Sequence, residues 1–586
     1  MPDLDYLIQY SEIFEGEPPE LSSLLKGISR SMLLKAASYF LGFANEGSQY
    51  SDYRNFLQMF FRSENAAVGN HVYNKILQLI KTRSNGIPFG ITFVNPQSIL
   101  QLFEYCFNNL DENHSQTESQ AEVSIFKAII LLNQVNNETQ EKGLEQTKEL
   151  DVDIKLAAIS LAMSYPNSEF INYNLPEILV AQLVKAVYLL EFLDGREDTK
   201  PLLNAFVKNF NCTDWKEYLK KLLPIVMAVN NTKREGIIEL IIPRDEEFKT
   251  KIEFIDNLIL PQEELLEEGY DFRTIRSKPL YSLEQGKYAV IYPLFVVEMV
   301  FKGLYFKLKQ IHDSLPIEHK IKGTNFRGFY CDNFSEQELL YKTLNNIFGK
   351  RNYIIHSGSY MKTTFGMIAE PDFYIRNGNS VFLFESKDIL IDGNIKSTFD
   401  YYQYESTFSK KLYFDVDDKG KKNKKAVLQL INNIERLLTN QLTNDTKNKP
   451  HLLRIYPILV LHDRQYNVAG LNVIINHWFA FELSLLRAKG INTDKVRPII
   501  IIDIDSLIFY EEVFKSGNIR LNDIIDDYFS YITVNKKKVY KTQVEVDYQL
   551  TKKLNPFSIF LANHVRRNNL NKKPKILFDK IVKVFA

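Results

Sequence analysis

Apolar side chains recur at three- and four-residue steps through much of the first 265 residues. This spacing gathers them on one side of a helix, where they can face a core. The pattern is clearest over residues 21–43, 53–61, 125–135, 154–163, 178–192 and 215–229. Polar, acidic sequence on both sides of the 125–135 stretch predicts long connections or solvated helix. We therefore predict a mainly α-helical N-terminal region over residues 1–265.

The pattern changes from about Tyr270. Residues 279–283 and 288–293 read as two short strands across a turn, and residues 295–311 as a buried helix. We assign residues 266–330 to a connecting hairpin-helix module.

An α/β pattern follows over residues 331–510. Ser335 with Glu338 three residues later is typical of a capping box, which predicts a helix over 335–348. Strand-like and helical stretches then alternate, with strands expected at 353–355, 363–369, 373–376, 381–387, 455–461 and 496–504 and a helix at 425–440. The chain is therefore expected to be an α+β multidomain protein. A helical N-terminal region precedes an α/β core with a mixed β-sheet flanked by helices.

Two acidic motifs lie on the strands in the middle of this core. Glu370-Pro-Asp372 ends just before one expected strand, and Glu385-Ser-Lys387 ends the next. If the intervening loop is residues 377–380, Arg376 pairs with Val381 and Asp372 falls opposite Glu385, with about 5 Å between their Cβ atoms. Two carboxylates this close repel each other unless a cation lies between them. Because hard divalent ions prefer carboxylate oxygen, this pair predicts a Mg²⁺ site, with Mn²⁺ as a substitute.

Lys387 follows Glu385 by two residues, so both side chains project from the same face of the strand. Its ammonium group could then orient a metal-bound water and offset charge that develops on a phosphate. The strand is otherwise apolar over 381–384. Charged side chains at the end of such a buried strand therefore indicate a functional role. The alternative is that Glu385 and Lys387 lie on a solvent-exposed face, as Glu and Lys two residues apart on a strand often do.

The two motifs and the order of elements resemble the PD-(D/E)XK, or restriction-endonuclease-like, nuclease superfamily over roughly residues 335–505. The resemblance implies a metal-dependent nuclease core, with Asp372 and Glu385 as metal ligands and Lys387 as the catalytic lysine. It also implies accessory roles for Glu338 on the first helix and Gln429 on the later one. Glu338 is equally explained as a capping-box acid, and Gln429 is followed four residues on by Asn433 where the matching branch has tyrosine.

Basic residues gather in two places although the formal net charge of the chain is zero. Residues 535–586 hold 13 lysines and arginines against 3 aspartates and glutamates, and a lysine-rich run precedes the 425–440 helix. Such clusters favour a nucleic-acid partner, because lysine and arginine neutralise phosphates, but a solvated turn or a basic end explains them equally well. The candidate contacts are Lys421, Lys422, Lys424, Lys425, Arg566, Arg567, Lys572 and Lys573. Residues 511–586 are accordingly expected to form a basic C-terminal extension, with helices at 557–567 and 575–585.

No apolar run is long enough to span a membrane, and the three cysteines show no paired spacing. We expect a cytoplasmic protein that does not bind membranes. The principal hypothesis is a Mg²⁺-dependent endodeoxyribonuclease. Its arrangement resembles effectors of bacterial antiviral defence, and repair, recombination and mobile-element processing are open alternatives. Its helical region would restrain it, or would recognise a target, a partner protein or a second copy. The alternatives are a catalytically inactive nucleic-acid-binding or assembly subunit and an RNA-cleaving nuclease.

Overall fold

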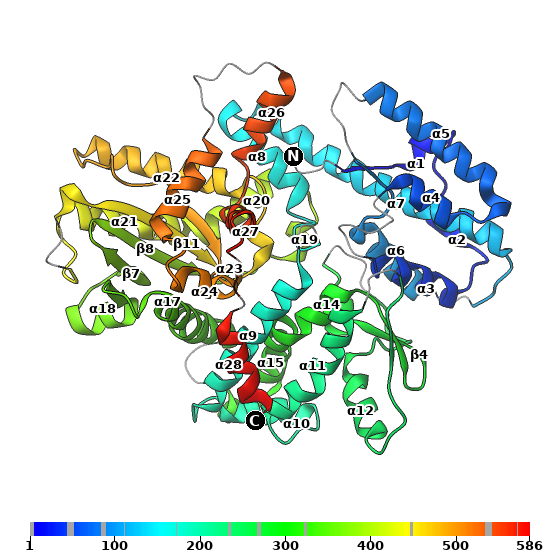
Figure 1. Ribbon diagram of the computed structural model, residues 1–586, viewed down its shortest axis with the longest axis horizontal. Helices are drawn as coiled ribbons and strands as arrows, with labels where there is room; N and C mark the ends of the chain where they lie inside the picture. Colours follow the sequence, from blue (N-terminus) through cyan, green and yellow to red (C-terminus); the bar gives the residue numbers. More distant parts are fainter. Residues whose placement is uncertain are drawn as a thin grey trace.

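The structure is a computed structural model that describes residues 5–43, 52–83, 90–109, 112–170, 173–232, 236–266, 271–321, 325–445, 449–533, 542–570, 572 and 574–585. It is a mixed α/β protein. Helices α3 (Arg30–Leu41), α6 (Pro96–Asn108) and α7 (Glu118–Glu145) lie on one side of the molecule and a five-stranded sheet lies on the other (Figure 1).

The predicted N-terminal helices are present, with two changes. The 21–43 stretch forms α2 (Leu21–Leu25) and α3, because the chain turns at Gly27 with φ +79°, where a Cβ atom would lie 2.3 Å from the Ser115 hydroxyl oxygen. The 125–135 stretch is the middle of α7, whose C-terminal part is the solvated helix that the polar sequence allowed. The other expected helices are α4 (Tyr53–Phe60), α8 (Val152–Ser164), α9 (Leu175–Asp194) and α11 (Trp215–Asn231).

The connecting segment forms the predicted hairpin and helix. Strands β4 (Leu280–Glu284) and β5 (Lys287–Val290) pair antiparallel, and β3 (Glu239–Ile241) adds a third strand from the preceding region. The helix runs through α14 (Pro293–Glu298), a π-helical turn η4 (Met299–Gly303) and α15 (Leu304–Ser314).

The larger sheet has the strand order β12-β11-β8-β7-β6. Strands β6 (Ile354–Ser357), β7 (Phe373–Asn377) and β8 (Ser380–Lys387) pair antiparallel, whereas β11 (Arg454–Leu461) and β12 (Ile500–Asp503) continue from β8 in parallel. The sheet is therefore mixed, as predicted. Helices α21 (Ala426–Leu438) and α22 (Leu471–Ala488) contact each other, and α21 also packs against β8.

The expected strand at 363–369 is wrong, because residues 363–365 are the last turn of a helix, α18 (Gly358–Phe365), and residues 366–369 form no strand. The Ser357 hydroxyl accepts the backbone N–H of Tyr360 and caps the helix, and Gly366 ends it with φ +61°. The Thr363 hydroxyl donates to the carbonyl of Ser359 at 2.9 Å. These caps outweigh the strand preference of the threonines, which is a weak and context-dependent signal.

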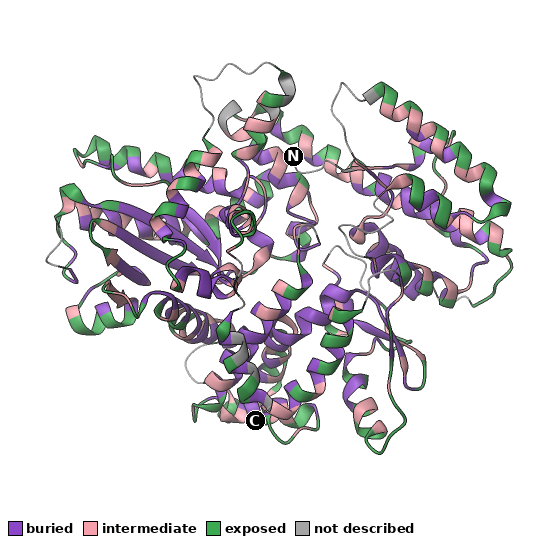
Figure 2. Ribbon diagram, viewed as in Figure 1, coloured by how far each residue is buried: buried purple, intermediate pink, exposed green. Residues whose placement is uncertain are grey.

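Both faces of the larger sheet are covered, so β8 is buried over most of its length (Figure 2). Phe382 and Phe384 belong to the core that includes residues of α9, whereas Val381 and Leu383 belong to the core that includes residues of α8, α21 and α22. Full coverage explains why the strand reads as a continuous apolar run and not as an alternating one. Helices from the N-terminal region thus contribute to the packing on both faces.

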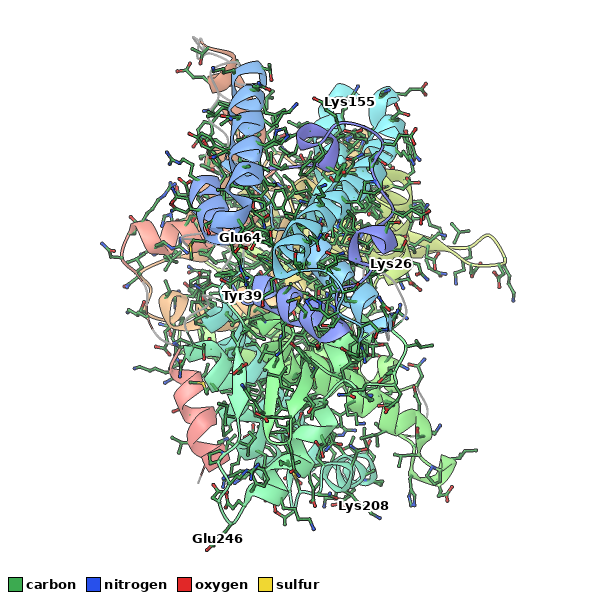
Figure 3. The ribbon with its side chains drawn as sticks, turned by 90° about the vertical axis from the view of Figure 1, so that its right-hand side faces the viewer. Lys26, Tyr39, Glu64, Lys155, Lys208 and Glu246 are labelled. Carbon is green, nitrogen blue, oxygen red and sulfur yellow. The ribbon has the colours of Figure 1, made fainter. Side chains whose placement is uncertain are left out.

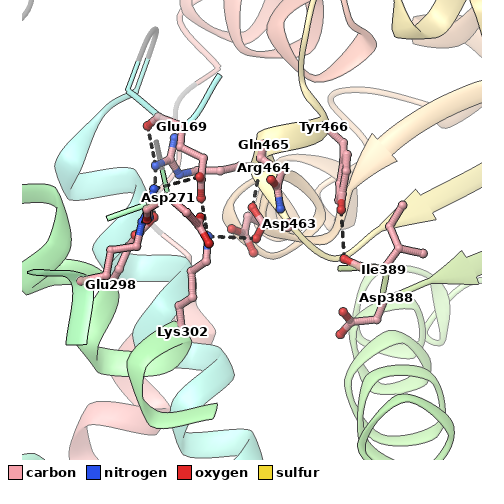
Figure 4. Close-up of polar contacts among 12 residues, drawn as sticks. Glu169, Asp271, Glu298, Lys302, Asp388, Ile389, Asp463, Arg464, Gln465 and Tyr466 are labelled. Carbon is pink, nitrogen blue, oxygen red and sulfur yellow. Dashed lines mark hydrogen bonds and ion pairs between the residues drawn. The ribbon is translucent and has the colours of Figure 1, made fainter. Parts of the chain in front are cut away.

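A buried ion cluster joins this region to the sheet (Figure 4). Glu169, between α8 and α9, accepts hydrogen bonds from Arg276 at 2.9 Å, from Lys396 at 2.6 Å and from Lys302. Arg464, just after β11, donates to the Glu169 backbone carbonyl at 2.8 Å. Three parts of the chain that are far apart in sequence therefore meet at one carboxylate. Lys155 of α8 lies at the opposite end of the molecule from Lys208 and Glu246 (Figure 3).

The C-terminal extension packs onto the rest of the molecule. Helix α27 (Phe557–Arg567) contacts β12, and α28 (Lys575–Phe585) contacts α9 and α11. Lys580 of α28 is buried and forms an ion pair with Glu191 of α9. The two predicted C-terminal helices are thus confirmed, and part of their positive charge is neutralised within the chain.

Candidate active site

The β7–β8 hairpin has the register predicted from the sequence. Arg376 pairs with Val381, and the ladder runs outward to Phe373 opposite Phe384. The next pair in this register is Asp372 and Glu385. The turn has Gly378 at φ +57°, a conformation that favours glycine in tight hairpin loops.

The three predicted catalytic residues lie together at the end of this hairpin. The Asp372 carboxylate accepts the backbone N–H of Ser386 at 2.7 Å, which holds it across the end of β8. The Lys387 ammonium donates to Glu385 Oε1 at 2.6 Å, so these two side chains share one face of the strand. Ser386 points the other way, and its hydroxyl lies 2.7 Å from Nε2 of His462.

Glu385 is the most deeply buried member of the group. Its side chain is 1% exposed, and its Oε2 atom is buried without a hydrogen-bond partner. Burial and the nearby charge of Asp372 raise the pKa of Glu385 to about 8, although Lys387 acts in the opposite direction. Burial likewise raises the pKa of Asp372 despite the charge of Lys387. Two carboxylates that are both hard to ionise need a positive charge beside them.

A third carboxylate, Glu336, acts on this pair. It lies in a helix that runs without a break through α16 (Phe326–Phe329), the π-helical segment η6 (Tyr330–Leu340) and α17 (Tyr341–Phe348). The Tyr341 hydroxyl donates to Glu336 at 2.7 Å. Burial and the charge of Asp372 raise the pKa of Glu336 to about 7. Glu336 also contributes to the raised pKa of Glu385.

The residue of this helix predicted from the sequence to assist the site is Glu338, and Glu336 was not predicted. The capping box expected at Ser335 is wrong, because the helix begins after Asn325 and Ser335 lies inside it. Glu338 forms an ion pair with Lys342 one turn on. Glu336 precedes the buried Leu339 and Leu340 by three and four residues, so the helical spacing already placed it on their side.

Gln429 lies on α21, the helix that packs against β8. It is partly buried, and its side-chain oxygen has no hydrogen-bond partner. Asn433, which replaces the tyrosine of the matching branch, donates its side-chain amide to the Gln429 backbone carbonyl at 3.1 Å. The accessory role of Gln429 stays a prediction.

The lysine-rich run before α21 forms a hairpin of β9 (Phe414–Val416) and β10 (Lys422–Lys424), not an irregular loop. Lys421, Lys422 and Lys424 are exposed, whereas Lys425 is partly buried at the start of α21. The Lys422 ammonium lies 4.0 Å from the centre of the Phe414 ring.

The predicted basic contacts of the C-terminal extension lie at and after the end of α27. Arg566 and Arg567 are exposed on its last turn, and Lys572 is exposed beyond it. Lys573 lies outside the described residues.

The donor set at the hairpin fits a divalent cation. Glu385 Oε2 is a buried oxygen without a donor, and the adjacent Asp372 supplies a second carboxylate. Within the ranges that the structure describes, no group of three or more histidine, cysteine, aspartate or glutamate side chains forms a ready-made metal site. Two carboxylates with retained waters are nevertheless a common Mg²⁺ environment, because this ion dehydrates reluctantly.

Comparisons of the chain with protein-family models, with curated proteins and with solved structures find no match. Among the described residues, no helix combines the length and the apolar character needed to cross a bilayer. The chemistry of the hairpin site is therefore the basis for assigning a function.

Proposed function

We propose that this protein is a metal-dependent nuclease that hydrolyses phosphodiester bonds of DNA, most simply as an endonuclease. One observation supports the proposal above the others. Glu385 is a buried carboxylate with an unpartnered oxygen, placed beside Asp372 and paired with Lys387 at the end of a strand. An ionised carboxylate in such surroundings costs free energy unless a cation completes the site.

In this proposal Asp372 and Glu385 would hold Mg²⁺ or Mn²⁺. A bound divalent ion would supply a water of lowered pKa and neutralise charge on the scissile phosphate. Lys387 would orient the attacking water through its ammonium group and offset the negative charge of the transition state. Glu336 is the accessory acid of the site, since its charge acts on both Asp372 and Glu385.

Nucleic acid would be bound through the exposed basic residues. The three lysines of the β9–β10 hairpin and its turn, together with Arg566, Arg567 and Lys572, are exposed to solvent, where they would contact phosphates. Phosphate contacts of this kind position a duplex without reading its sequence.

The deciding experiment incubates purified protein with supercoiled plasmid and Mg²⁺ or Mn²⁺, and follows nicking and linearisation. Wild type is expected to cut, and Asp372→Asn and Lys387→Met to lose about 10²–10³-fold in rate, the range for removing one transition-state contact. Lys489→Met is the matched control, because Lys489 forms a surface ion pair with Glu435. Equal cleavage by Lys387→Met and wild type would refute the site assignment.

DNA and RNA substrates of matched sequence, tested in the same assay, distinguish a DNA-cleaving from an RNA-cleaving nuclease. Preferential cleavage of RNA would show that RNA, and not DNA, is the substrate. A protein that binds both polymers and cuts neither would be the inactive binding subunit. The antiviral role is tested by the plating efficiency of phage on bacteria that express wild type or Lys387→Met, and protection by both variants alike would exclude a nuclease effector.

A further inference from the structure

Lys387 is the last residue of β8, so the position of its side chain depends on how the chain leaves the sheet. On its N-terminal side, the strand pairing and the Ser386–Asp372 hydrogen bond fix the backbone. On its C-terminal side, the chain turns away from the sheet at Asp388, where strand pairing ends.

Asp388 is held by one arginine and one serine from the helix before the sheet. Arg327 Nη2 donates to the backbone carbonyl of Asp388 at 2.6 Å and also to its Oδ1 atom at 2.6 Å. The Ser335 hydroxyl donates to the other carboxylate oxygen at 2.7 Å. The next residue is held by the segment that follows β11, because the Tyr466 hydroxyl donates to the carbonyl of Ile389 at 3.0 Å (Figure 4).

Arg327 is itself well fixed. Its guanidinium lies 5.4 Å from the centre of the Tyr305 ring and 5.7 Å from that of Tyr330. The Arg327 side chain is 24% exposed and that of Asp388 is 12% exposed, so the pair is only weakly screened by solvent. A planar guanidinium that meets two acceptors on one residue sets direction as well as distance.

We propose that Arg327 is a positioning residue for Lys387. Its hydrogen bonds to the carbonyl and the carboxylate of Asp388 fix the backbone next to Lys387. They thereby fix the position of the Lys387 ammonium relative to Glu385 and the reacting phosphate. The proposal rests on the proposed nuclease function, and it assigns the helix that precedes the sheet a part in the activity.

A cavity of about 50 Å³ borders the contact between Arg327 and Asp388. Arg327, Asp388 and His462 line it, together with Lys302, Asp463 and Arg464 of the buried ion cluster. Removing the Arg327 side chain would enlarge this polar space, so a free guanidinium ion could enter it. This gives a chemical test of positioning.

Steady-state cleavage is compared in Arg327→Ala, Arg327→Lys, Ser335→Ala and wild type. Arg327→Ala should lose about 100-fold in kcat, the cost of a misplacement near 1 Å, with KM within about twofold. The kcat of Arg327→Lys should lie between those of wild type and Arg327→Ala. Added guanidinium should restore part of the kcat of Arg327→Ala. If Arg327→Ala does not fold, Arg327→Lys and Ser335→Ala carry the comparison.

Arg376→Ala is the matched control, since Arg376 forms a similarly buried ion pair with Asp445 at the other end of the same hairpin. A folded Arg327→Ala with wild-type kcat, or an equal kcat loss in Arg376→Ala, overturns the proposal. A readout that needs no cleavage is the rate at which an amine-reactive reagent acylates Lys387, followed by mass spectrometry.

Acylation of Lys387 should be several-fold faster in Arg327→Ala than in wild type and unchanged in Arg376→Ala. If wild type cuts no nucleic acid, the proposed function fails, and acylation alone decides the positioning. Equal acylation rates in wild type and Arg327→Ala then overturn it.

Discussion

Replacing Glu169 should destabilise the whole protein, because one buried cation, Lys396, and two partly buried cations converge on its carboxylate. Glu169 is 2% exposed, and Arg276, Lys302 and Lys396 all pair with it. Removing one partner of a buried pair costs about 3–5 kcal/mol, because it leaves an uncompensated charge. Typical domains have only about 5–15 kcal/mol in total. Glu169→Gln keeps the shape of the side chain and removes its charge, so we expect the free energy of unfolding to fall by about 3–5 kcal/mol.

Chemical denaturation followed by far-UV circular dichroism measures this loss. Glu435→Gln is the control, because its pair with Lys489 lies at the surface and should be worth about 1 kcal/mol or less. Glu169→Gln combined with Lys396→Met should be more stable than Glu169→Gln alone, since one of the stranded charges is gone. A loss below about 1 kcal/mol in Glu169→Gln, or no recovery in the double variant, would refute the reasoning.

The pH dependence of the Glu169→Gln variant follows from Lys396. Burial lowers the pKa of Lys396 from its ordinary value even with Glu169 present, and loss of Glu169 should lower it further. A base whose pKa is depressed by folding gains relative stability as the pH rises through its folded pKa. The gap between Glu169→Gln and wild type should therefore narrow from pH 7 to about pH 10. A constant gap would contradict this account.

Three further outcomes can be measured. Metal-free protein should lose stability as the pH rises from about 5 to about 8, because folded Glu385, with its pKa raised to about 8, keeps a proton that an unfolded glutamate releases; Mg²⁺ should restore the melting temperature at high pH, and Glu385→Gln should remove both effects. Burial lowers the pKa of His462 to about 4, so stability should also fall as the pH drops from 6.5 toward 4, and His462→Gln should flatten that slope. Replacing Lys422 and Lys424 by alanine should lower the salt dependence of DNA binding by about two phosphate contacts, whereas Lys580→Ala should leave it unchanged because Lys580 pairs with Glu191.

The hairpin part of the site could be predicted because its determinants are local. A turn at Gly378 and alternation along one strand are enough to set Asp372 opposite Glu385 and to place Lys387 on the same face. Predicting Glu336 as a residue of the site would have required knowing where its helix begins. Ser335 resembled a cap, but its hydroxyl is used by Asp388, 53 residues further along the chain. Such a contact leaves no trace in the spacing of nearby residues.

The sequence by itself determined the six predicted helical stretches of the N-terminal region and the register of the β7–β8 hairpin, because periodicity and turn chemistry act over a few residues. Only the tertiary structure decided that α8 and α9 belong to the cores on opposite faces of the sheet and that α28 lies on α9 and α11. The tertiary structure also brought Glu169 to its three cations and Arg327 to the residue after Lys387. These contacts join segments from about 60 to more than 200 residues apart. They form because charges buried together must be paired, whatever their separation in the chain.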